Sequence, residues 1–146
     1  MQFEVNRTDF HDTRAVTIST TSTPTETSPN ELQLGQIRLT VERFALTTNN
    51  ITYAVAGEML DYWGFFPADE PGADGKRWGR IPAMGLGSVA ESAHPDIAVG
   101  GRYFGFYPMA ADVVIDATPH GNAFRDVGAH RAEHAATYTD FRDVTT

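Results

Sequence analysis

Apolar and polar side chains alternate in two segments near the N-terminus, residues 2–10 (QFEVNRTDF) and 14–20 (RAVTIST). A period of two places alternate side chains on opposite faces of a strand, so both segments are predicted to be strands. The alternation is clearest in residues 34–46 (LGQIRLTVERFAL), where it runs from Ile37 and changes phase near Glu42. Because a change of phase is typical of a β-bulge, we expect a long strand that bends there.

Glycine-rich apolar segments predict more strands in the second half of the chain. Residues 81–91 (IPAMGLGSVAE) read as one strand, and residues 99–116 (VGGRYFGFYPMAADVVID) as two strands broken at Pro108. Glycines within strands allow close backbone approach or positive φ, which favours a curved sheet. Residues 49–60 (NNITYAVAGEML) instead show helical spacing after an asparagine suited to an N-cap, and residues 126–143 show a weak helical pattern. The predicted class is mainly β, a curved barrel with one or two short helices.

Two segments are predicted to be loops. Residues 17–30 contain nine Ser or Thr among fourteen residues together with two prolines, and residues 61–80 combine turn-forming Gly and Pro with aromatic side chains. The first loop is preceded by too few residues to form a domain. Residues 1–146 are therefore expected to form a single domain, with residues 120–146 as a helical tail.

The charge balance limits the classes of partner. The sequence has 19 acidic and 11 basic residues, for a net charge of −8, so its surface should repel nucleic acids and anionic membranes. It has no cysteine, which excludes disulfides, thiolate zinc sites and a cysteine nucleophile. No signal peptide and no apolar run of about 18 residues is evident, and we expect a cytoplasmic protein without a membrane or nucleic-acid partner.

The segment HRAEH, with His130, Glu133 and His134, has the spacing of a zinc-binding helix in some metalloproteases. Such a site needs a third ligand and room for a metal-bound water. The residues that follow carry Asp140 and Asp143 but no glutamate. We therefore interpret HRAEH as a solvated helix face and expect no zinc.

The order of these segments resembles a known domain. The strand GQIRLTVERFAL, the helix NITYAVAG, the strand IPAMGLGSVAES and the segment VGGRYFGFYPMAADVVI are similar to the GroES-like domain of medium-chain dehydrogenases and reductases, closest to the zinc-free quinone oxidoreductases. The family's Val-Gly-Asp-Arg-Val turn falls on residues 99–103, with Gly101 in place of Asp. The resemblance covers residues 34–116, and the C-terminal tail looks like an uncharacterised bacterial branch of the superfamily, a domain of unknown function. The implied fold is a GroES-like, partly open β-barrel.

Members of that superfamily pair this domain with a Rossmann domain, bind NADPH or NADH between the two, and transfer hydride to a carbonyl or enone. The resemblance therefore implies the substrate-side domain of a zinc-free, NAD(P)H-dependent oxidoreductase, with NADPH as cofactor. The sequence contains no βαβ unit with a glycine-rich phosphate turn, so no cofactor-binding residue is assigned and no activity is expected without a Rossmann domain. The expected partners are a small-molecule substrate and either a missing Rossmann domain or a second copy of the chain. The alternative function is a stand-alone small-molecule-binding or oligomerising barrel without catalysis.

The resemblance also implies candidate site residues. The family's Asn-x-x-Asp-x-Tyr motif falls on Thr48, Ile51 and Tyr53, so only the tyrosine is retained. Tyr53 is the candidate catalytic residue, as a hydrogen-bond donor to a carbonyl oxygen. Thr48, Asn49 and Asn50 would face the substrate and the nicotinamide.

The aromatic side chains that follow this motif allow two interpretations. Trp63 and Phe65, together with Phe66 and Trp78, could shape a hydrophobic substrate pocket next to the candidate helix. Alternatively they close the barrel or cover a partner domain. The sequence favours neither interpretation.

Overall fold

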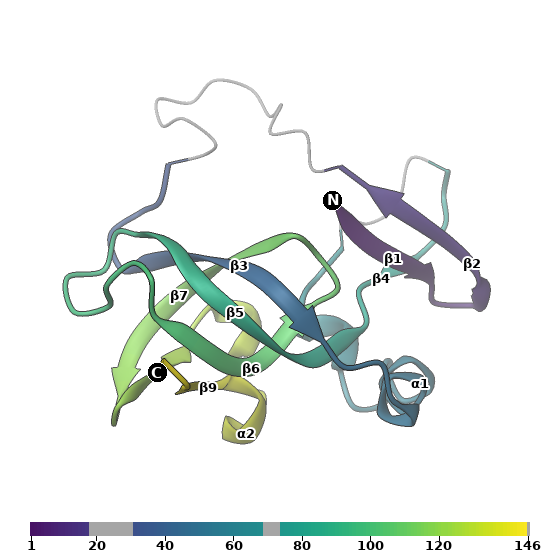
Figure 1. Ribbon diagram of the computed structural model, residues 1–146. Helices are drawn as coiled ribbons and strands as arrows, with labels where there is room; N and C mark the ends of the chain where they lie inside the picture. Colours follow the sequence, from purple (N-terminus) through teal and green to yellow (C-terminus); the bar gives the residue numbers. More distant parts are fainter. Residues whose placement is uncertain (18–30, 69–73, 146) are drawn as a thin grey trace.

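The computed structural model describes residues 1–17, 31–68 and 74–145 and is mainly β (Figure 1). The strands of a three-stranded sheet lie in the order β2-β1-β4, and six further strands form a closed barrel in the order β3-β5-β6-β9-β8-β7. The strand bounds are β1 Gln2–Asn6, β2 Asp9–Val16, β3 Gln36–Phe44, β4 Trp78–Gly79, β5 Pro82–Ser92, β6 Arg102–Pro108, β7 Asp112–His120, β8 Ala123–Asp126 and β9 Asp140–Asp143. The α-helices are α1 Thr48–Val55 and α2 Ala136–Thr139, and the 3-10 helices are η1 Tyr62–Phe65 and η2 Ala129–Arg131. The predicted mainly β barrel with one or two short helices is confirmed, and the barrel is closed where we expected it to be partly open.

The N-terminal segment forms two strands as predicted, but with other bounds: the strand predicted over residues 2–10 is broken by a turn at residues 7–8, and β2 covers residues 9–16, where the second strand was predicted over 14–20. β1 and β2 pair antiparallel, but β2 begins at Asp9 because the chain turns after Asn6. The side-chain oxygen of Asn6 accepts a hydrogen bond from the backbone N–H of Thr8 at 3.0 Å, which is the contact that forms an Asx-type turn. Residues 18–30, most of the loop predicted over 17–30, lie outside the described residues, as do residues 69–73.

The central strand β3 bends as the pattern predicted. β3 pairs with β5 on one side and with β7 on the other. Its register against β5 shifts between Val41 and Arg43, which places the predicted bulge at Glu42. β3 ends shortly after the bulge, and the chain continues from there into α1 (Figure 1).

Helix α1 begins two residues before the position that the predicted N-cap implies. Asn49 was predicted to cap the helix, but the N-cap is Thr47, whose hydroxyl oxygen accepts a hydrogen bond from the Asn49 N–H at 3.2 Å. The side-chain oxygen of Asn50 in turn accepts the N–H of Thr47 at 2.7 Å, completing a capping box. The helix ends at Val55, and the next residues form turns.

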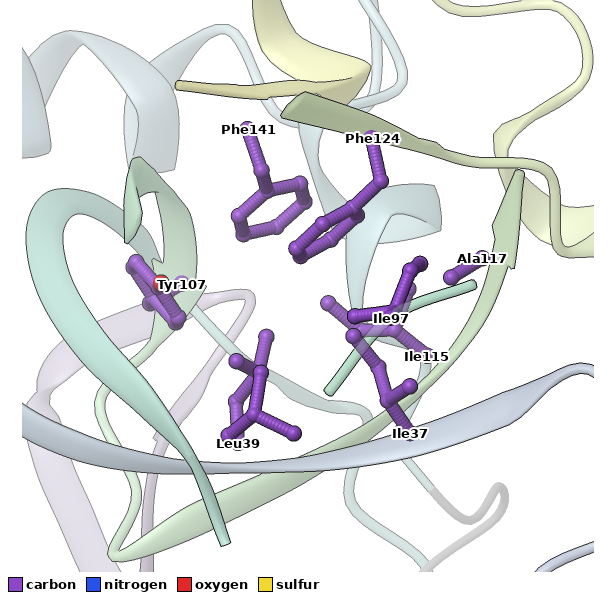
Figure 2. Packing of buried hydrophobic residues seen from close by; sticks show 9 residues of the cluster. Ile37, Leu39, Ile97, Tyr107, Ile115, Ala117, Phe124 and Phe141 are labelled. Carbon is purple, nitrogen blue, oxygen red and sulfur yellow. The ribbon is translucent and has the colours of Figure 1, made fainter. Parts of the chain in front are cut away.

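The helical tail predicted over residues 120–146 is correct only in part. The segment contains the short helices η2 and α2, but also β8 and β9, which close the barrel between β7 and β6. Phe124 and Phe141 are fully buried, and their rings stack with centroids 4.9 Å apart in the barrel interior (Figure 2). Burial of two aromatic rings therefore outweighs the weak helical pattern of this segment.

Each strand of the barrel contributes apolar side chains to its interior. Its buried cluster comprises Ile37, Leu39, Val89, Ile97, Tyr107, Ile115, Ala117, Phe124 and Phe141 (Figure 2). Gly105 is required for this packing, because a Cβ atom there would collide with the ring of Phe141. None of the helices among the described residues is long and apolar enough to cross a membrane.

Candidate functional site

The main candidate site is an apolar cavity of about 780 Å³ between the N-terminal sheet and the barrel. Strands β1 and β2, the end of β3, helix α1 and residues 109–111 contribute to its wall. Its larger apolar side chains are Phe3, Val5, Phe10, Phe44, Leu46, Ile51, Ile81 and Met109. This volume lies within the range of small-molecule sites, which are usually apolar with few polar groups.

Two side-chain amides lie in this apolar wall, and their hydrogen-bond states differ. Asn50 uses both ends of its amide, since its oxygen accepts the Thr47 N–H and its nitrogen donates to the carbonyl oxygen of Pro82 at 3.0 Å. Gln2 is 6% exposed, and its Oε1 atom has no hydrogen-bond partner. Gln2 also lines a second cavity, and along β1 it alternates with Phe3 and Val5, so its side chain lies on the opposite face of the strand from theirs.

A second cavity of about 780 Å³ lies on the other side of the same N-terminal residues. Its wall carries the charged side chains of Arg38, Arg80, Glu91 and Asp112, along with His130. Arg38 lies 3.4 Å from both Glu91 and Asp112, so these charges largely compensate each other. We call this the polar cavity.

Of the candidate substrate-binding residues on α1, the structure places one at a cavity. Asn50 lines the apolar cavity, whereas Thr48 and Asn49 are exposed and line neither cavity. Sequence reasoning missed the contribution of β1, where Gln2, Phe3 and Val5 line the apolar cavity. The alternation in residues 2–10 predicted which face of this strand is apolar, but nothing in it indicates what that face contacts.

Tyr53, the candidate catalytic residue, is packed among other aromatic rings. It is 7% exposed and lines neither cavity. Its ring centroid lies 4.6 Å from that of Tyr62, and its edge-on contact with Phe106 is 5.4 Å. Burial raises the pKa of Tyr53, and the neighbouring Tyr138 raises it further. The tyrosine thus keeps its proton at neutral pH, and its catalytic role stays a prediction.

Three tyrosines of this aromatic cluster lie close together. The ring centroid of Tyr138 lies 6.4 Å from that of Tyr53 and 6.1 Å from that of Tyr62. Interaction with Tyr138 raises the pKa of Tyr62 to about 12, and burial adds to the effect. The three tyrosines therefore form a neutral cluster between α1, η1 and α2.

The aromatic side chains after α1 are buried rather than grouped at one pocket. Trp63 and Phe65 are 3% and 2% exposed, and neither lines a cavity. The indole of Trp63 lies against Gly57 and Gly79, where a Cβ on Gly79 would come within 2.5 Å of the ring. Phe65 stacks on His134 with ring centroids 3.9 Å apart. Phe66 of the same set lines the polar cavity, and both interpretations of these aromatic residues stay predictions.

The HRAEH segment does not form the predicted helix face. His130 lies in the 3-10 helix η2, and His134 precedes α2, so the two histidines do not share one α-helical turn. The Nε2 atom of His134 lies 3.0 Å from the backbone oxygen of Asp61, which ties this segment to η1. Among the described residues there is no group of three or more His, Cys, Asp or Glu side chains that could hold a metal ion.

Arg131, which lies between the two histidines in the sequence, forms a buried ion pair with Asp126. Arg131 is 1% exposed, and its Nε atom lies 2.9 Å from Oδ2 of Asp126, which is 3% exposed. The guanidinium also lies over the ring of Phe66, at 4.4 Å from the ring centroid. Burial raises the pKa of Asp126, although the positive charge of Arg131 opposes the increase. The ion pair therefore connects η2 with β8 and with the ring of Phe66.

Comparison with known proteins identifies the family. Residues 44–146 match a family described as a protein of unknown function, DUF2855. The chain belongs to the DUF2855 family. The matched region of this DUF2855 protein includes α1, the aromatic cluster and most of the barrel, but not β1 and β2. Neither the curated proteins nor the solved structures contain a match.

Proposed function

We propose that this DUF2855 protein binds an apolar small molecule in the apolar cavity. We further propose that it is the GroES-like, substrate-side domain of a zinc-free, NAD(P)H-dependent oxidoreductase acting on a carbonyl or enone. The observation that carries the binding function is the cavity of about 780 Å³, whose wall is almost entirely aliphatic or aromatic. The oxidoreductase assignment rests on the resemblance of residues 34–116 and is supported by the position of Asn50, which lines this cavity.

The described residues do not fit a complete nicotinamide dinucleotide. Pyrophosphate groups are usually bound by a glycine-rich turn before a helix, together with uncompensated donors or cations. The apolar cavity has no cationic side chain in its wall, and the polar cavity pairs Arg80 with Glu4 at 3.0 Å and Arg38 with Glu91. We therefore propose that a Rossmann domain supplies the cofactor site and that these residues hold the substrate.

A titration tests the binding function directly. The neutral fluorescent probe N-phenyl-1-naphthylamine should bind with micromolar affinity and gain fluorescence in an apolar environment. The variant Ala15→Phe places a ring in the cavity wall and should weaken binding at least tenfold. Ala90→Phe is the matched control, because Ala90 is exposed on β5 and lines neither cavity. Equal affinities for both variants and the parent would contradict the proposal.

Calorimetric titration of NADPH separates the two parts of the proposal. We expect no binding to residues 1–146, because the described phosphate-binding groups do not suffice. Addition of NADPH with an apolar enone should then give no hydride transfer. Micromolar binding of NADPH would show that the chain carries its own cofactor site, contrary to the proposed division between two domains.

A second candidate function is favoured by a separate observation, an exposed apolar face along α1. Leu46, Ile51, Val55 and Met59 are 72%, 65%, 70% and 80% exposed, and residues 44–57 contain no charged side chain. In a chain of net charge −8, such a face is where two copies can meet with the least repulsion. This alternative is an oligomerising barrel module without catalysis.

Sedimentation velocity distinguishes this alternative. The parent should self-associate, and Val55→Asp should shift the equilibrium to monomer because it places a charge in the contact face. Leu34→Asp is the control, since Leu34 is 89% exposed but lies outside residues 44–57. A monomeric parent at high concentration would rule out the oligomerising module.

A further inference from the structure

We propose that the polar cavity is a second binding site, which accepts a zwitterion whose carboxylate and ammonium groups lie at opposite ends of a short apolar chain. The class of ligand follows from the charged side chains of the wall, which form two separate poles of opposite sign. This site depends neither on the apolar cavity nor on the oxidoreductase assignment, so it can be tested apart from them.

The positive pole is built around the carboxylate of Glu4, which is 1% exposed. Its oxygen atoms accept hydrogen bonds from Nε of Arg14 at 2.8 Å and from Nε of Arg80 at 3.0 Å, so one carboxylate lies between two guanidinium groups. Arg80 is the arginine of this group that lines the polar cavity. Its Nη1 atom donates to the carbonyl oxygen of Pro67, and its Nη2 atom makes no hydrogen bond to a described residue. The excess positive charge and this donor suit a ligand carboxylate.

The negative pole has the inverse composition. The guanidinium of Arg38 lies 3.4 Å from a carboxylate oxygen of Glu91 and 3.4 Å from one of Asp112, so two carboxylates lie beside one guanidinium. Both distances exceed the length of about 2.7–2.9 Å that is typical of charge-assisted hydrogen bonds. The side chains of Glu91 and Asp112 are also 56% and 51% exposed. These carboxylates therefore keep the capacity to accept hydrogen bonds from a ligand ammonium.

Strand register places the two poles on opposite sides of one point. Gln2 forms an antiparallel bridge with Ala110. Glu4 and Asp112 each lie two residues beyond this bridge, or about 7 Å along the strand direction. Because the two segments run antiparallel, these two offsets have opposite directions. An α-amino acid carries both charges on one carbon and cannot reach both poles, whereas a chain of several methylene groups can separate them.

Much of the remaining wall is apolar and suits such a chain. It includes Phe66, Pro67, Pro108, Ala110 and Val113. The poles also disfavour ligands with a single charge, because Glu91 and Asp112 repel an anion and Arg80 repels a cation. A molecule with both charges, held apart by methylene groups, meets an attractive group at each end.

Two constitutional isomers test the separation of the charges: 6-aminohexanoic acid, which carries them at opposite ends, and norleucine, which carries them on one carbon. In calorimetric titration at pH 7, 6-aminohexanoic acid should bind the parent chain with submillimolar affinity. Norleucine, hexanoate and hexylamine should each bind about tenfold more weakly or worse. Equal affinities for the two isomers, or no binding of 6-aminohexanoic acid, would overturn the proposal.

The variant Asp112→Asn tests the negative pole, since it removes one carboxylate and keeps the size of the side chain. Its affinity for 6-aminohexanoic acid should fall about fivefold, while its affinity for hexanoate should not fall. Asp116→Asn is the matched control, because Asp116 is exposed on the same strand and lines neither cavity. An equal loss in both variants would reduce the effect to the overall charge of the protein and contradict the proposal.

The variant Arg80→Gln tests the positive pole. It should weaken 6-aminohexanoic acid about fivefold without weakening hexylamine. Glu4 keeps its contact with Arg14 at 2.7 Å, so we expect the variant to fold, and thermal unfolding checks this. If it does not fold, the comparison of Asp112→Asn with Asp116→Asn decides. A folded variant that binds 6-aminohexanoic acid like the parent would overturn the proposal.

Competition with N-phenyl-1-naphthylamine separates the two cavities. 6-Aminohexanoic acid should leave the bound naphthylamine in place, because the two molecules occupy different cavities. Displacement of the naphthylamine would contradict the assignment of the zwitterion to the polar cavity while leaving the binding function of the apolar cavity intact.

Discussion

The two cavities have the same volume, about 780 Å³, and share part of one wall, yet they differ in chemistry. Met1, Gln2 and Ala110 contribute to both. Beyond these residues, one wall is aliphatic and aromatic, while the other carries arginine, glutamate, aspartate and histidine side chains. Because the two volumes are equal, any difference between the ligands that these cavities accept is expected to come from the composition of their walls.

The layers behind the two cavities also differ. Val5 and Ala54 of the apolar wall pack against Trp63, so this wall is backed by close contact between apolar groups. Phe66 of the polar wall lies under the guanidinium of Arg131, which pairs with Asp126. The apolar wall therefore depends on packing and the polar wall on a buried ion pair, and substitutions can test each dependence separately.

The largest effect is expected behind the polar wall. Asp126→Ala leaves the charge of Arg131 buried without its partner and should lower the free energy of unfolding by about 3–5 kcal/mol in urea denaturation. The double variant Asp126→Ala, Arg131→Met removes both charges and should recover most of this loss. A single variant that costs less than about 1 kcal/mol would mean that the ion pair does not support this wall.

A smaller loss is expected behind the apolar wall. Gly79→Ala brings a methyl group to 2.5 Å from the indole of Trp63 and should cost about 1–3 kcal/mol of unfolding free energy, measured by the same method. Trp63→Leu removes the ring that causes the collision. The cost of Gly79→Ala should therefore be much smaller in the Trp63→Leu background, and additive effects would argue against the contact.

The cap of α1 tests the edge of the apolar cavity. Thr47→Ala removes the hydroxyl that accepts the Asn49 N–H and should cost about 1 kcal/mol of unfolding free energy. The affinity for the naphthylamine probe should change little, because Asn50 still donates to Pro82 and remains in place. A tenfold loss of affinity would instead show that the cap positions the cavity wall.

The smallest effect is a pH dependence at the polar wall. Partial burial lowers the pKa of His130, and the effect exceeds the opposite influence of Asp126. In the window between the lowered folded-state pKa and the ordinary value of 6.5, the unfolded chain binds more protons than the folded chain. Stability should therefore fall as the pH falls through this window.

The variant His130→Gln isolates this contribution. Its unfolding midpoint, measured from pH 7.5 to pH 5, should decline less than that of the parent. Identical pH profiles would show that His130 titrates alike in the folded and unfolded chains and would remove it from the features that distinguish the polar wall.

The strands and the bulge could be predicted from sequence because they depend on local alternation. The change of phase near Glu42 marks the register shift of β3, and the glycine-rich segments form β5 and β6. The C-terminal strands could not be predicted, because Phe124 and Phe141 are brought together only when the barrel closes. Their short strands pair through contacts distant in sequence, which no local pattern records.

The candidate site was harder to predict than the fold. Asn50 lines the apolar cavity, and its role in substrate binding stays a prediction. The resemblance did not include β1, whose residues also line this cavity. The unsatisfied oxygen atom of Gln2 is likewise visible only once every neighbour of that atom is known. Similarly, the sequence shows that aromatic residues cluster around η1 but does not show whether their side chains face a cavity or the core.

The contact of Trp63 with the back of the apolar wall gives the protein an internal optical sensor. The chain has two tryptophans, and Trp63 packs against Val5 and Ala54, whereas Trp78 lies beneath the guanidinium of Arg14 at 4.1 Å. A molecule entering the apolar cavity would change the packing next to one indole and leave the other under its cation. Intrinsic emission could therefore be used to screen unlabelled compounds, with the variant Trp78→Phe leaving Trp63 as the single tryptophan that reports.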